Sequence, residues 1–506
     1  MPLLSAADPT VDAAGGDGGF SPAVSWYGPN ATWINNLTEV VGGHGLHGFV
    51  FNDSETPAGA QYGTYNYCNM PHVRRQEYPV AGDEYELVYV EVIHRHHKRT
   101  PYASNCFVNE PYPWDCTNAH LFYYGQPSQS SAPPEDAPDA APDAAPAYWT
   151  IQHGSTNPFQ PSGCYGNCQF PQITQGGLSD SWQHGRDLRG VYGELLGFLP
   201  GANEADAVEF RVTNNVITSQ VAGMMVSAMG FSDGSGDPFP LTVQPSSTDS
   251  LEPSYECPKA EALYESYGVG SVSWDWHRHL AASDPLFDAL DAVSGVLPGD
   301  EEFHKSWDHY FDSLSSRQCH GYALPCREDD GSGDEDEETQ GDEKRKSRMK
   351  RRRTTCITQQ EADTVYRLGQ YEYSYIYRDS PHSLLAATGS FGVWLAELSQ
   401  HVRDAVAGAG PVRYRHNVAH DGSLSRLLSL LQIDAMVWPG MGAEVVFELF
   451  RKQGEYFVRA LWGGQPLRSS HPKLGVVDMV DVDVLLDYID DLVGVNARRV
   501  LEYCET

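Results

Sequence analysis

The sequence lacks several features that would place the protein in a membrane or on a nucleic acid. No apolar run approaches the roughly 18 residues that a membrane-spanning helix needs, so no transmembrane helix is expected. Residues 1–19 have neither a basic start nor a hydrophobic middle, and they do not form a recognisable signal peptide. Positive charge is scarce, because 34 Lys and Arg residues face 68 Asp and Glu residues. The resulting net charge of −34 disfavours nucleic acids and anionic membranes as partners.

Cysteine pairs with the spacing of a zinc site are also missing. The ten cysteines are scattered, and no repeated close pairs backed by histidines occur among them. Most are therefore interpreted as disulfides in an oxidising compartment or as buried thiols, with a connectivity that the sequence leaves open. Three N-glycosylation sequons begin at Asn30, Asn36 and Asn52. Together with the even number of cysteines, they indicate a secreted protein.

The most informative stretch is 85–105, which places two arginines and three histidines behind an apolar run. Tyr85 to Ile93 is rich in β-branched and aromatic residues and predicts a strand that is covered on both faces. In open α/β sheets, reacting groups collect where strands end, and this end carries Arg95, His96 and Arg99. Two guanidiniums can hold the oxygens of a phosphoryl group while an imidazole attacks phosphorus. The stretch therefore predicts a phosphate site.

This stretch resembles a known family. The run RHHKRTP, which starts at Arg95, is similar to the RHGxRxP signature of the histidine acid phosphatases. These form the acid phosphatase and phytase branch of the phosphoglycerate-mutase-like histidine phosphatase superfamily. His97 stands where the family has a glycine, a residue that permits close backbone approach or an unusual φ angle. Near the C-terminus, a predicted strand at 413–419 delivers His420 and Asp421, which resemble the late His-Asp motif of the family.

A third, weaker match involves Arg211. It lies near the end of a predicted strand at 208–213 and resembles the arginine of the Arg-Ser-Thr motif of the family, although Val212 replaces the serine. Periodicity predicts three further elements: a helix that includes Leu178 and Leu195, a hairpin of 444–450 with 455–462, and a final helix near 480–493.

The resemblance implies an α/β fold. A phosphoglycerate-mutase-like three-layer α/β/α domain would carry an inserted smaller, mainly helical domain. At 506 residues the chain is long enough for both. The expected parts are an N-terminal extension at 1–84, the catalytic domain at 85–230 and 381–506, and the helical insert at 231–380. Two segments are interpreted as disordered from their composition, namely the Pro/Ala-rich loop 125–147 and the charged run 327–355.

The resemblance also implies an enzyme, a phosphatase that acts on small-molecule phosphate monoesters without a metal or another cofactor. His96 would attack phosphorus and form a phosphohistidine, and Asp421 would protonate the leaving alcohol as general acid. Because Asp421 must be protonated while the adjacent helix N-terminus favours its carboxylate, an acidic pH optimum is expected. The phosphate-binding residues would be Arg95, Arg99, Arg211 and His420.

Two alternatives stay open. In the first, His94, His96 and His97 bind a metal ion in a metal-dependent hydrolase, with His416 or His420 completing the site. Three nearby cations, Arg95, Lys98 and Arg99, count against it because they would repel the ion. In the second, His97 crowds the phosphate pocket, and the chain is a catalytically impaired relative that binds a phosphorylated ligand or a protein.

Overall fold

The computed structural model describes residues 24–45, 65–120, 148–151, 156–157, 159, 163–231, 239–329 and 353–505. The predicted loop at 125–147, the sequon at Asn52 and most of the charged run 327–355 lie outside these residues. No helix within the described ranges combines the length and hydrophobicity that crossing a membrane requires.

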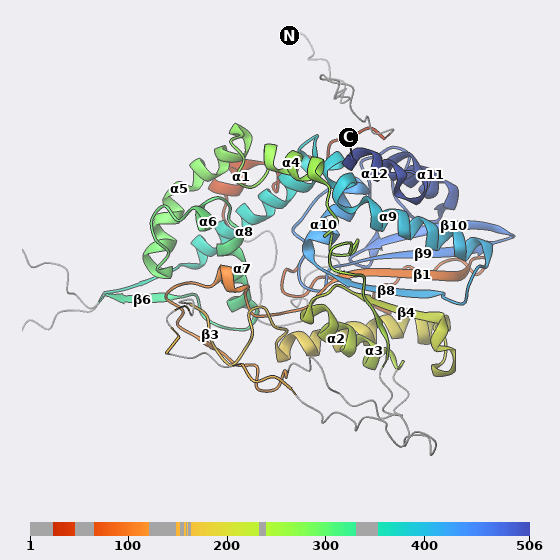
Figure 1. The fold of residues 1–506 in the computed structure, drawn as a ribbon, viewed down its shortest axis with the longest axis horizontal. Helices are drawn as coiled ribbons and strands as arrows, with labels where there is room; N and C mark the ends of the chain where they lie inside the picture. Colours follow the sequence, from red (N-terminus) through yellow and green to blue (C-terminus); the bar gives the residue numbers. More distant parts are fainter. Residues whose placement is uncertain are drawn as a thin grey trace, which may run out of the picture.

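A mixed central sheet organises the larger part of the molecule (Figure 1). Its strand order is β11-β10-β9-β1-β8-β4-β5, with β12 beside β10. β1, β8, β4 and β5 run parallel, whereas β9 runs antiparallel to β1. The strands are β1 (Glu86–Arg95), β4 (Val208–Val212), β5 (Leu241–Thr242), β8 (Tyr414–Ala419), β9 (Glu444–Lys452), β10 (Glu455–Trp462), β11 (Gln465–Pro466) and β12 (Val480–Asp481). The predicted strands and the predicted hairpin are therefore confirmed.

Helices cover both faces of this sheet. Val90 and Val92 of β1 pack into a core with α2 and α3, whereas Tyr89 and Ile93 pack into a core with α9, α10 and α11. One layer consists of α2 (Gln175–Leu188), which continues as the π-helical turn η2 (Arg189–Leu195), and α3 (Val216–Met229). The other contains α9 (Ser383–Ala407), α10 (Asp421–Leu430), α11 (Val482–Val493) and α12 (Arg498–Glu505). The three-layer α/β/α architecture is confirmed, and so is the final helix.

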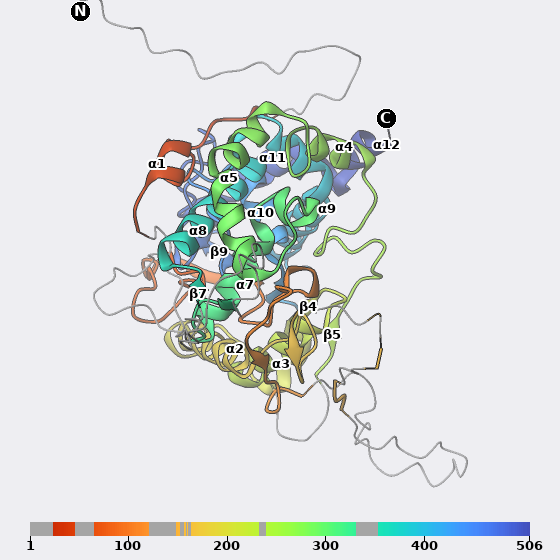
Figure 2. The same cartoon turned by 90° about the vertical axis from the view of Figure 1, so that its left-hand side faces the viewer.

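A smaller helical domain lies at one end of the sheet, and Figure 2 views the molecule from that end. Its core contains Trp307, Phe311 and Leu368, together with Tyr67 from the N-terminal region and Trp438 from the segment before β9. Its elements are α1 (Leu37–Gly42), α5 (Trp274–Ser294), α6 (Glu301–His304), α7 (Asp308–Cys319), α8 (Gln359–Ser374) and η4 (Tyr375–Asp379). Short elements near the interface are η1 (Ala103–Asn105), β2 (Pro113–Trp114) and β3 (Tyr165–Gly166).

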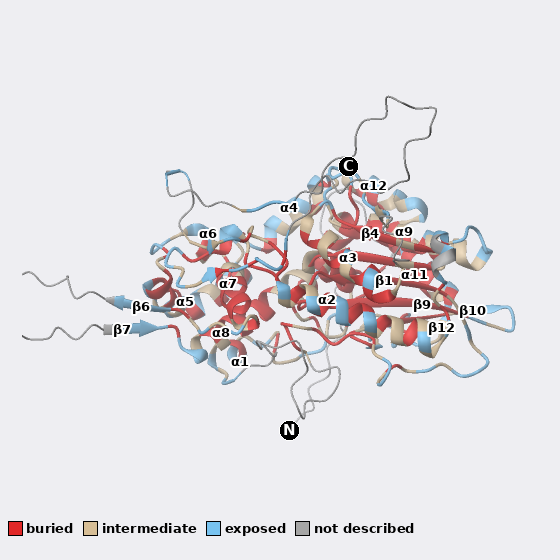
Figure 3. Cartoon of the chain, turned by 90° about the horizontal axis from the view of Figure 1, so that it is seen from below, coloured by how far each residue is buried: buried red, intermediate tan, exposed pale blue. Residues whose placement is uncertain are grey.

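Two segments differ from the expected domain organisation. α4 (Pro258–Tyr267) falls within the expected helical insert, but it packs on α9, and Cys257 is joined to Cys504 of α12. The ends of the run expected to be disordered at 327–355 are ordered strands. β6 (Cys326–Asp329) pairs with β7 (Arg353–Cys356), and a disulfide closes this hairpin at the far end of the helical domain (Figure 3).

All ten cysteines form disulfides, as the even count predicts for most of them. One of these bonds ties the N-terminal region to the helical domain. The pairs are Cys68–Cys319, Cys106–Cys164, Cys116–Cys168, Cys257–Cys504 and Cys326–Cys356.

Candidate active site

The candidate nucleophile lies where the carboxyl ends of parallel strands meet. β1 ends at Arg95 and β8 ends at Ala419, and the backbone N–H of His96 donates to the Ala419 carbonyl at 3.0 Å. Because the two strands are parallel, the residues that follow them leave the sheet at the same edge. His96 and His420 meet there, and their ring centroids are 5.5 Å apart. The structure thus brings together two motifs that are distant in the sequence.

His96 has one ring nitrogen free for chemistry. Its Nδ1 lies 3.0 Å from the carbonyl oxygen of His97, and this oxygen can accept a hydrogen bond only if Nδ1 carries the proton. Nε2 is then unprotonated, and its lone pair can attack phosphorus. Burial lowers the pKa of His96 well below its usual value, and the positive charges of Arg95 and Arg99 lower it further. The ring is therefore neutral, as a nucleophile requires.

The side chain of Arg95 is held on several sides. Its Nη2 lies 2.9 Å from Oδ2 of Asp421, and its Nη1 donates to the carbonyl of Pro439 at 2.7 Å. The Tyr67 hydroxyl lies 3.3 Å from the same Nη1. Only 1% of the Arg95 side chain is exposed, so its position at the sheet edge is fixed before any ligand binds.

Arg99 is held by the helical domain. Its Nη1 lies 2.9 Å from Oδ1 of Asp312 on α7 and donates to the carbonyl of Thr100 at 2.9 Å. The guanidinium also lies over the ring of Tyr102, at 4.2 Å from the ring centroid. α7 therefore positions one of the two arginines that follow β1.

Asp421 is the first residue of α10 and has two buried partners. Besides Arg95, the indole N–H of Trp438 donates to its Oδ2 at 2.9 Å. Burial alone would raise the pKa of Asp421, but Arg95, the Trp438 hydrogen bond and Arg99 together hold it below its usual value. Asp421 is therefore a carboxylate in the ligand-free protein.

His420, the residue before Asp421, faces the end of β4. Its Nε2 lies 2.9 Å from the hydroxyl of Thr213, which directly follows that strand. Burial lowers the pKa of His420 to about 4, so the ring is neutral over most of the pH range and can take part in hydrogen bonds with a ligand.

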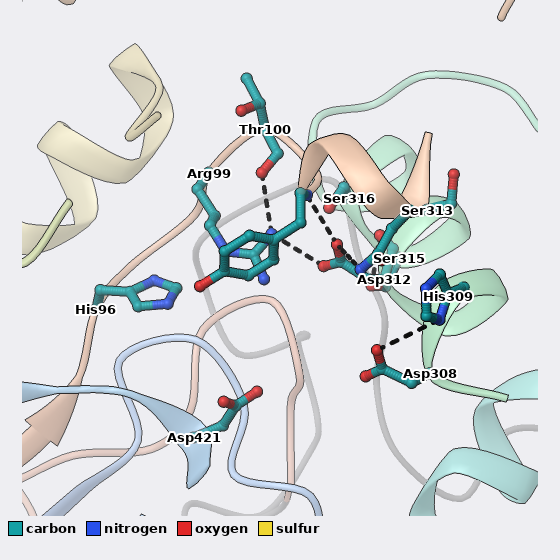
Figure 4. Close-up of polar contacts among 12 residues, drawn as sticks. His96, Arg99, Thr100, Asp308, His309, Asp312, Ser313, Ser315, Ser316 and Asp421 are labelled. Atoms are coloured by element: carbon teal, nitrogen blue, oxygen red, sulfur yellow. Dashed lines mark hydrogen bonds and ion pairs between the residues drawn. The ribbon is translucent and has the colours of Figure 1, made fainter. Parts of the chain in front are cut away.

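Another carboxyl group faces the site from the start of α7. Figure 4 shows the side chains of His96, Arg99, Asp308 and Asp421 arranged around one space. Desolvation, followed by repulsion from Asp312 and Asp421, raises the pKa of Asp308 to about 7. Because 44% of the Asp308 side chain is exposed, water screens part of this effect. Asp308 is thus a carboxyl group that can hold a proton in mildly acidic solution.

Arg211, the remaining predicted phosphate ligand, is paired with two acidic residues. Its guanidinium lies 3.0 Å from Asp249, 2.8 Å from Glu397 of α9 and 2.9 Å from the Ser250 hydroxyl. Strand alternation explains these contacts, because Phe210 and Val212 face the α2 and α3 layer while Arg211 faces α9. The role of Arg211 as a phosphate ligand therefore stays a prediction, and its two ion pairs count against it.

His97 points away from the candidate phosphate site. Its Nε2 lies 3.1 Å from Nδ1 of His184 on α2, and its ring packs against Gly442. Gly442 has a φ of +71°, and a Cβ added to it would lie 2.4 Å from Cε1 of His97. Because residue 442 on the loop before β9 is a glycine, there is room for the His97 ring beside it. The ring therefore does not crowd His96.

The predicted metal-binding set is also different in the structure. One nitrogen from each of His94, His97 and His184 lies within 4.8 Å of the others, and His96 is not in this group. The ring of His96 instead faces His420. The expected set of His94, His96 and His97 is therefore wrong in one member.

Several residues of the site were not predicted from the sequence. Thr213 is the threonine of the weak Arg-Val-Thr match, and its position directly after a strand was an available signal. Trp438 opens the segment WPGMG, whose sequence did not reveal its hydrogen bond to Asp421. Asp308 and Asp312 are four residues apart on one helix, in the expected helical insert, where no motif pointed to them.

Comparisons with known proteins agree with these motifs. No family model matches the chain. Over 313 residues, it is 21% identical to the prostatic acid phosphatase of Bos taurus, a match that covers 60% of this chain and 71% of that protein. This similarity confirms the resemblance to acid phosphatases.

Two solved structures match most of the chain with low sequence identity. The phytase from D. castellii has a TM-score of 0.47 and 13% identity, covering 90% of this chain and 92% of that chain. The phytase from Klebsiella sp. ASR1 has a TM-score of 0.44 and 15% identity, covering 82% and 97%. Because both TM-scores are below 0.5, these structures carry no conclusion about substrate.

Proposed function

We infer that this chain is a histidine acid phosphatase, and we propose that it hydrolyses phosphate monoesters through a phosphohistidine at His96. The observation that carries the proposal is the state of His96, whose ring is neutral and has Nδ1 engaged and Nε2 free beside Arg95 and Arg99. The sequence similarity to an acid phosphatase supports the same activity.

The substrate phosphate binds to the two arginines and His420. In the transition state of phosphoryl transfer, negative charge spreads over three equatorial oxygens, so that positioned cations and hydrogen-bond donors provide most of the catalysis. Arg95 and Arg99 already have the carboxylates of Asp421 and Asp312 as partners, which fix their orientation before the substrate binds. Little reorganisation is then needed during the reaction.

Phosphoryl transfer takes two steps. In the first, Nε2 of His96 attacks phosphorus, the ester P–O bond breaks, and the leaving oxygen takes a proton from Asp421. In the second, a water molecule attacks the phosphorus of the phosphohistidine and gives a proton to Asp421. Inorganic phosphate leaves, and both residues return to their starting states.

Substrate binding and protonation of Asp421 are coupled. In the ligand-free protein Asp421 is a carboxylate paired with Arg95. A bound phosphate dianion shares Arg95 and adds negative charge nearby, and both effects raise the pKa of Asp421. Activity should therefore rise as the pH falls into the acidic range. A rate that stays constant from acidic to mildly alkaline pH would contradict this role of Asp421.

The structure weakens the reasons for the two alternatives. The impaired relative requires His97 to crowd the phosphate, but the His97 ring contacts His184 and Gly442 instead. The metal-dependent hydrolase requires His96 to bind the ion together with His94 and His97, but the group of histidines that could hold a metal contains His184 in place of His96.

We also propose that the protein acts in an oxidising, extracytoplasmic compartment. All ten cysteines are paired, which is typical of secreted proteins. Asn30 and Asn36, which begin two of the sequons, are exposed.

Hydrolysis of an aryl phosphate tests the proposed activity. The wild type should turn over at acidic pH, and brief treatment with a chelator should leave the rate unchanged. His96→Ala should lower kcat by more than roughly a thousandfold, as loss of a nucleophile does. His277→Ala is the matched control, because His277 is exposed on α5. A folded wild type without turnover, or a His96→Ala protein with full activity, would refute the proposal.

A further inference from the structure

A group of buried imidazoles lies behind the catalytic loop, on the α2 side of the sheet. His94 belongs to β1, His97 to the loop that follows it, and His184 to α2, and all three side chains are fully buried. Two more rings pack against them. The His72 ring lies 4.2 Å from that of His184, and the His416 ring lies 4.8 Å from that of His94.

The nitrogens of this group have the arrangement of a metal site. Nε2 of His97 and Nδ1 of His184 face each other at 3.1 Å. Two nitrogens on one tetrahedral Zn²⁺, with Zn–N distances of 2.0–2.1 Å, lie about 3.3 Å apart. Nε2 of His94 is buried without a hydrogen-bond partner among the described residues. A buried polar atom of this kind points to a ligand that the protein chain itself does not supply.

Two of the rings are oriented as metal-bound histidines usually are. Nδ1 of His94 lies 2.9 Å from the carbonyl oxygen of Arg95, and Nε2 of His184 lies 2.9 Å from Oε2 of Glu444. Each oxygen accepts a hydrogen bond from a ring N–H, so the other nitrogen of each ring carries a lone pair that faces the group. Glu444 also accepts from the backbone N–H of Val73, which fixes the carboxylate.

Nearby positive charge does not prevent metal binding. The three cations that would repel an ion each have a carboxylate partner, and Glu444 adds negative charge on the side of His184. The pairs are Arg95 with Asp421, Lys98 with Asp180, and Arg99 with Asp312. The three positive charges that count against a metal site in the sequence are thus neutralised by carboxylates in the folded protein.

We propose that His94, His97 and His184 bind a Zn²⁺ ion, with Glu444 orienting His184. The ion joins the end of β1 to α2 and takes no part in phosphoryl transfer. It holds the backbone on both sides of His96, since two of its ligands are residues 94 and 97. His97 is thus a metal ligand at the position where a glycine stands in the family signature. The proposal does not depend on the phosphatase activity.

Metal content measures this site directly. An untagged wild type, purified from cultures supplemented with Zn²⁺ and dialysed to remove loosely bound ions, should contain close to one Zn²⁺ per chain by mass spectrometry. His184→Gln and His97→Gly should each lower this content at least tenfold. Glycine is the family residue at position 97 and removes the contact with Gly442, so that variant should fold. The control His277→Gln changes an exposed histidine and should retain the metal.

Two further measurements distinguish this site from adventitious binding. Protein produced with Co²⁺ in place of Zn²⁺ should show visible absorption bands of a nitrogen-bound tetrahedral ion, and the bands should be missing in His97→Gly. Glu444→Gln should weaken binding roughly 10- to 100-fold, as loss of a carboxylate that orients a ligand does. A wild type that contains less than a tenth of an equivalent of Zn²⁺ would overturn the proposal. Metal that stays bound in both ligand variants would overturn it as well.

Discussion

Replacing Gly442 by alanine should destabilise the protein, and the size of the loss should depend on His97. Gly442 has a φ of +71°, where a residue with a side chain costs roughly 1–2 kcal/mol. The new Cβ would lie 2.4 Å from Cε1 and 2.8 Å from Nδ1 of His97. The backbone N–H of Gly442 donates to the carbonyl of His96 at 3.1 Å, which limits how far the loop can shift. Overpacking of this kind adds about 1–3 kcal/mol, so Gly442→Ala should lose about 2–5 kcal/mol in total.

The same substitution should cost less when residue 97 is glycine. Without the imidazole, only the backbone strain of about 1–2 kcal/mol remains. The two substitutions should therefore be coupled by roughly 1–3 kcal/mol, which a double-mutant cycle measures. Denaturant unfolding of the wild type, Gly442→Ala, His97→Gly and the double variant gives the four free energies. An equal loss in both backgrounds would refute the placement of His97 against Gly442, and with it the explanation of why His97 leaves the phosphate site open.

Three further predictions concern Arg211, Asp308 and one disulfide. Arg211→Ala should leave KM for an aryl phosphate within about twofold, yet lower the free energy of unfolding by roughly 3–5 kcal/mol, because the buried carboxylate of Asp249 loses its cation. A large rise in KM would contradict this. The KM of the wild type should rise as the pH increases toward about 7, because Asp308 loses its proton and repels the phosphate dianion, and Asp308→Asn should remove this rise. A KM profile identical to that of the wild type would argue against this effect. Replacing Cys257 and Cys504 by serine should lower the free energy of unfolding by roughly 2–5 kcal/mol, because this bond closes a long loop, and unchanged stability would contradict its structural role.

Local patterns were sufficient to predict the central strands β1, β4 and β8, the hairpin of β9 and β10, and the loop that carries His96. The run from Leu87 to Ile93 is apolar at every position except Glu91 because both faces of β1 are covered, and such a run indicates a strand buried on both sides. The motif RHHKRTP lies at the end of β1, and the motif His420-Asp421 lies at the end of β8, which runs parallel to β1. The positions of the two strand ends were therefore enough to predict that His96 and Asp421 would meet. These features depend on near neighbours in the sequence.

Long-range packing determined what the sequence could not show. Arg211 sits one position before the end of β4, and its partners Asp249 and Glu397 come from distant segments that have no recognisable pattern. Because side chains alternate along a strand, the side chain of Arg211 faces α9, opposite to Phe210 and Val212. Cysteine pairing is equally long-range, since Cys68 and Cys319 are 251 residues apart in the sequence.

The acidic residues of α7 were missed for a similar reason. Asp308 and Asp312 lie at the start of a helix, where acidic residues are common for electrostatic reasons alone. Only the docking of the helical domain against the sheet brings Asp312 to Arg99 and turns Asp308 toward the site. His184 was overlooked likewise, because it lies within an amphipathic helix whose composition indicates no special role.

Trapping the covalent intermediate tests the role of His96 most directly. The protein would be mixed with an aryl phosphate and quenched within milliseconds in alkaline denaturant, in which phosphohistidine persists. Mass spectrometry of the peptide that carries His96 should show the addition of one phosphoryl group during turnover, and His96→Ala should show none. Turnover by the wild type with no phosphorylated His96 at any time, or with the phosphoryl group on another residue, would contradict the proposed mechanism.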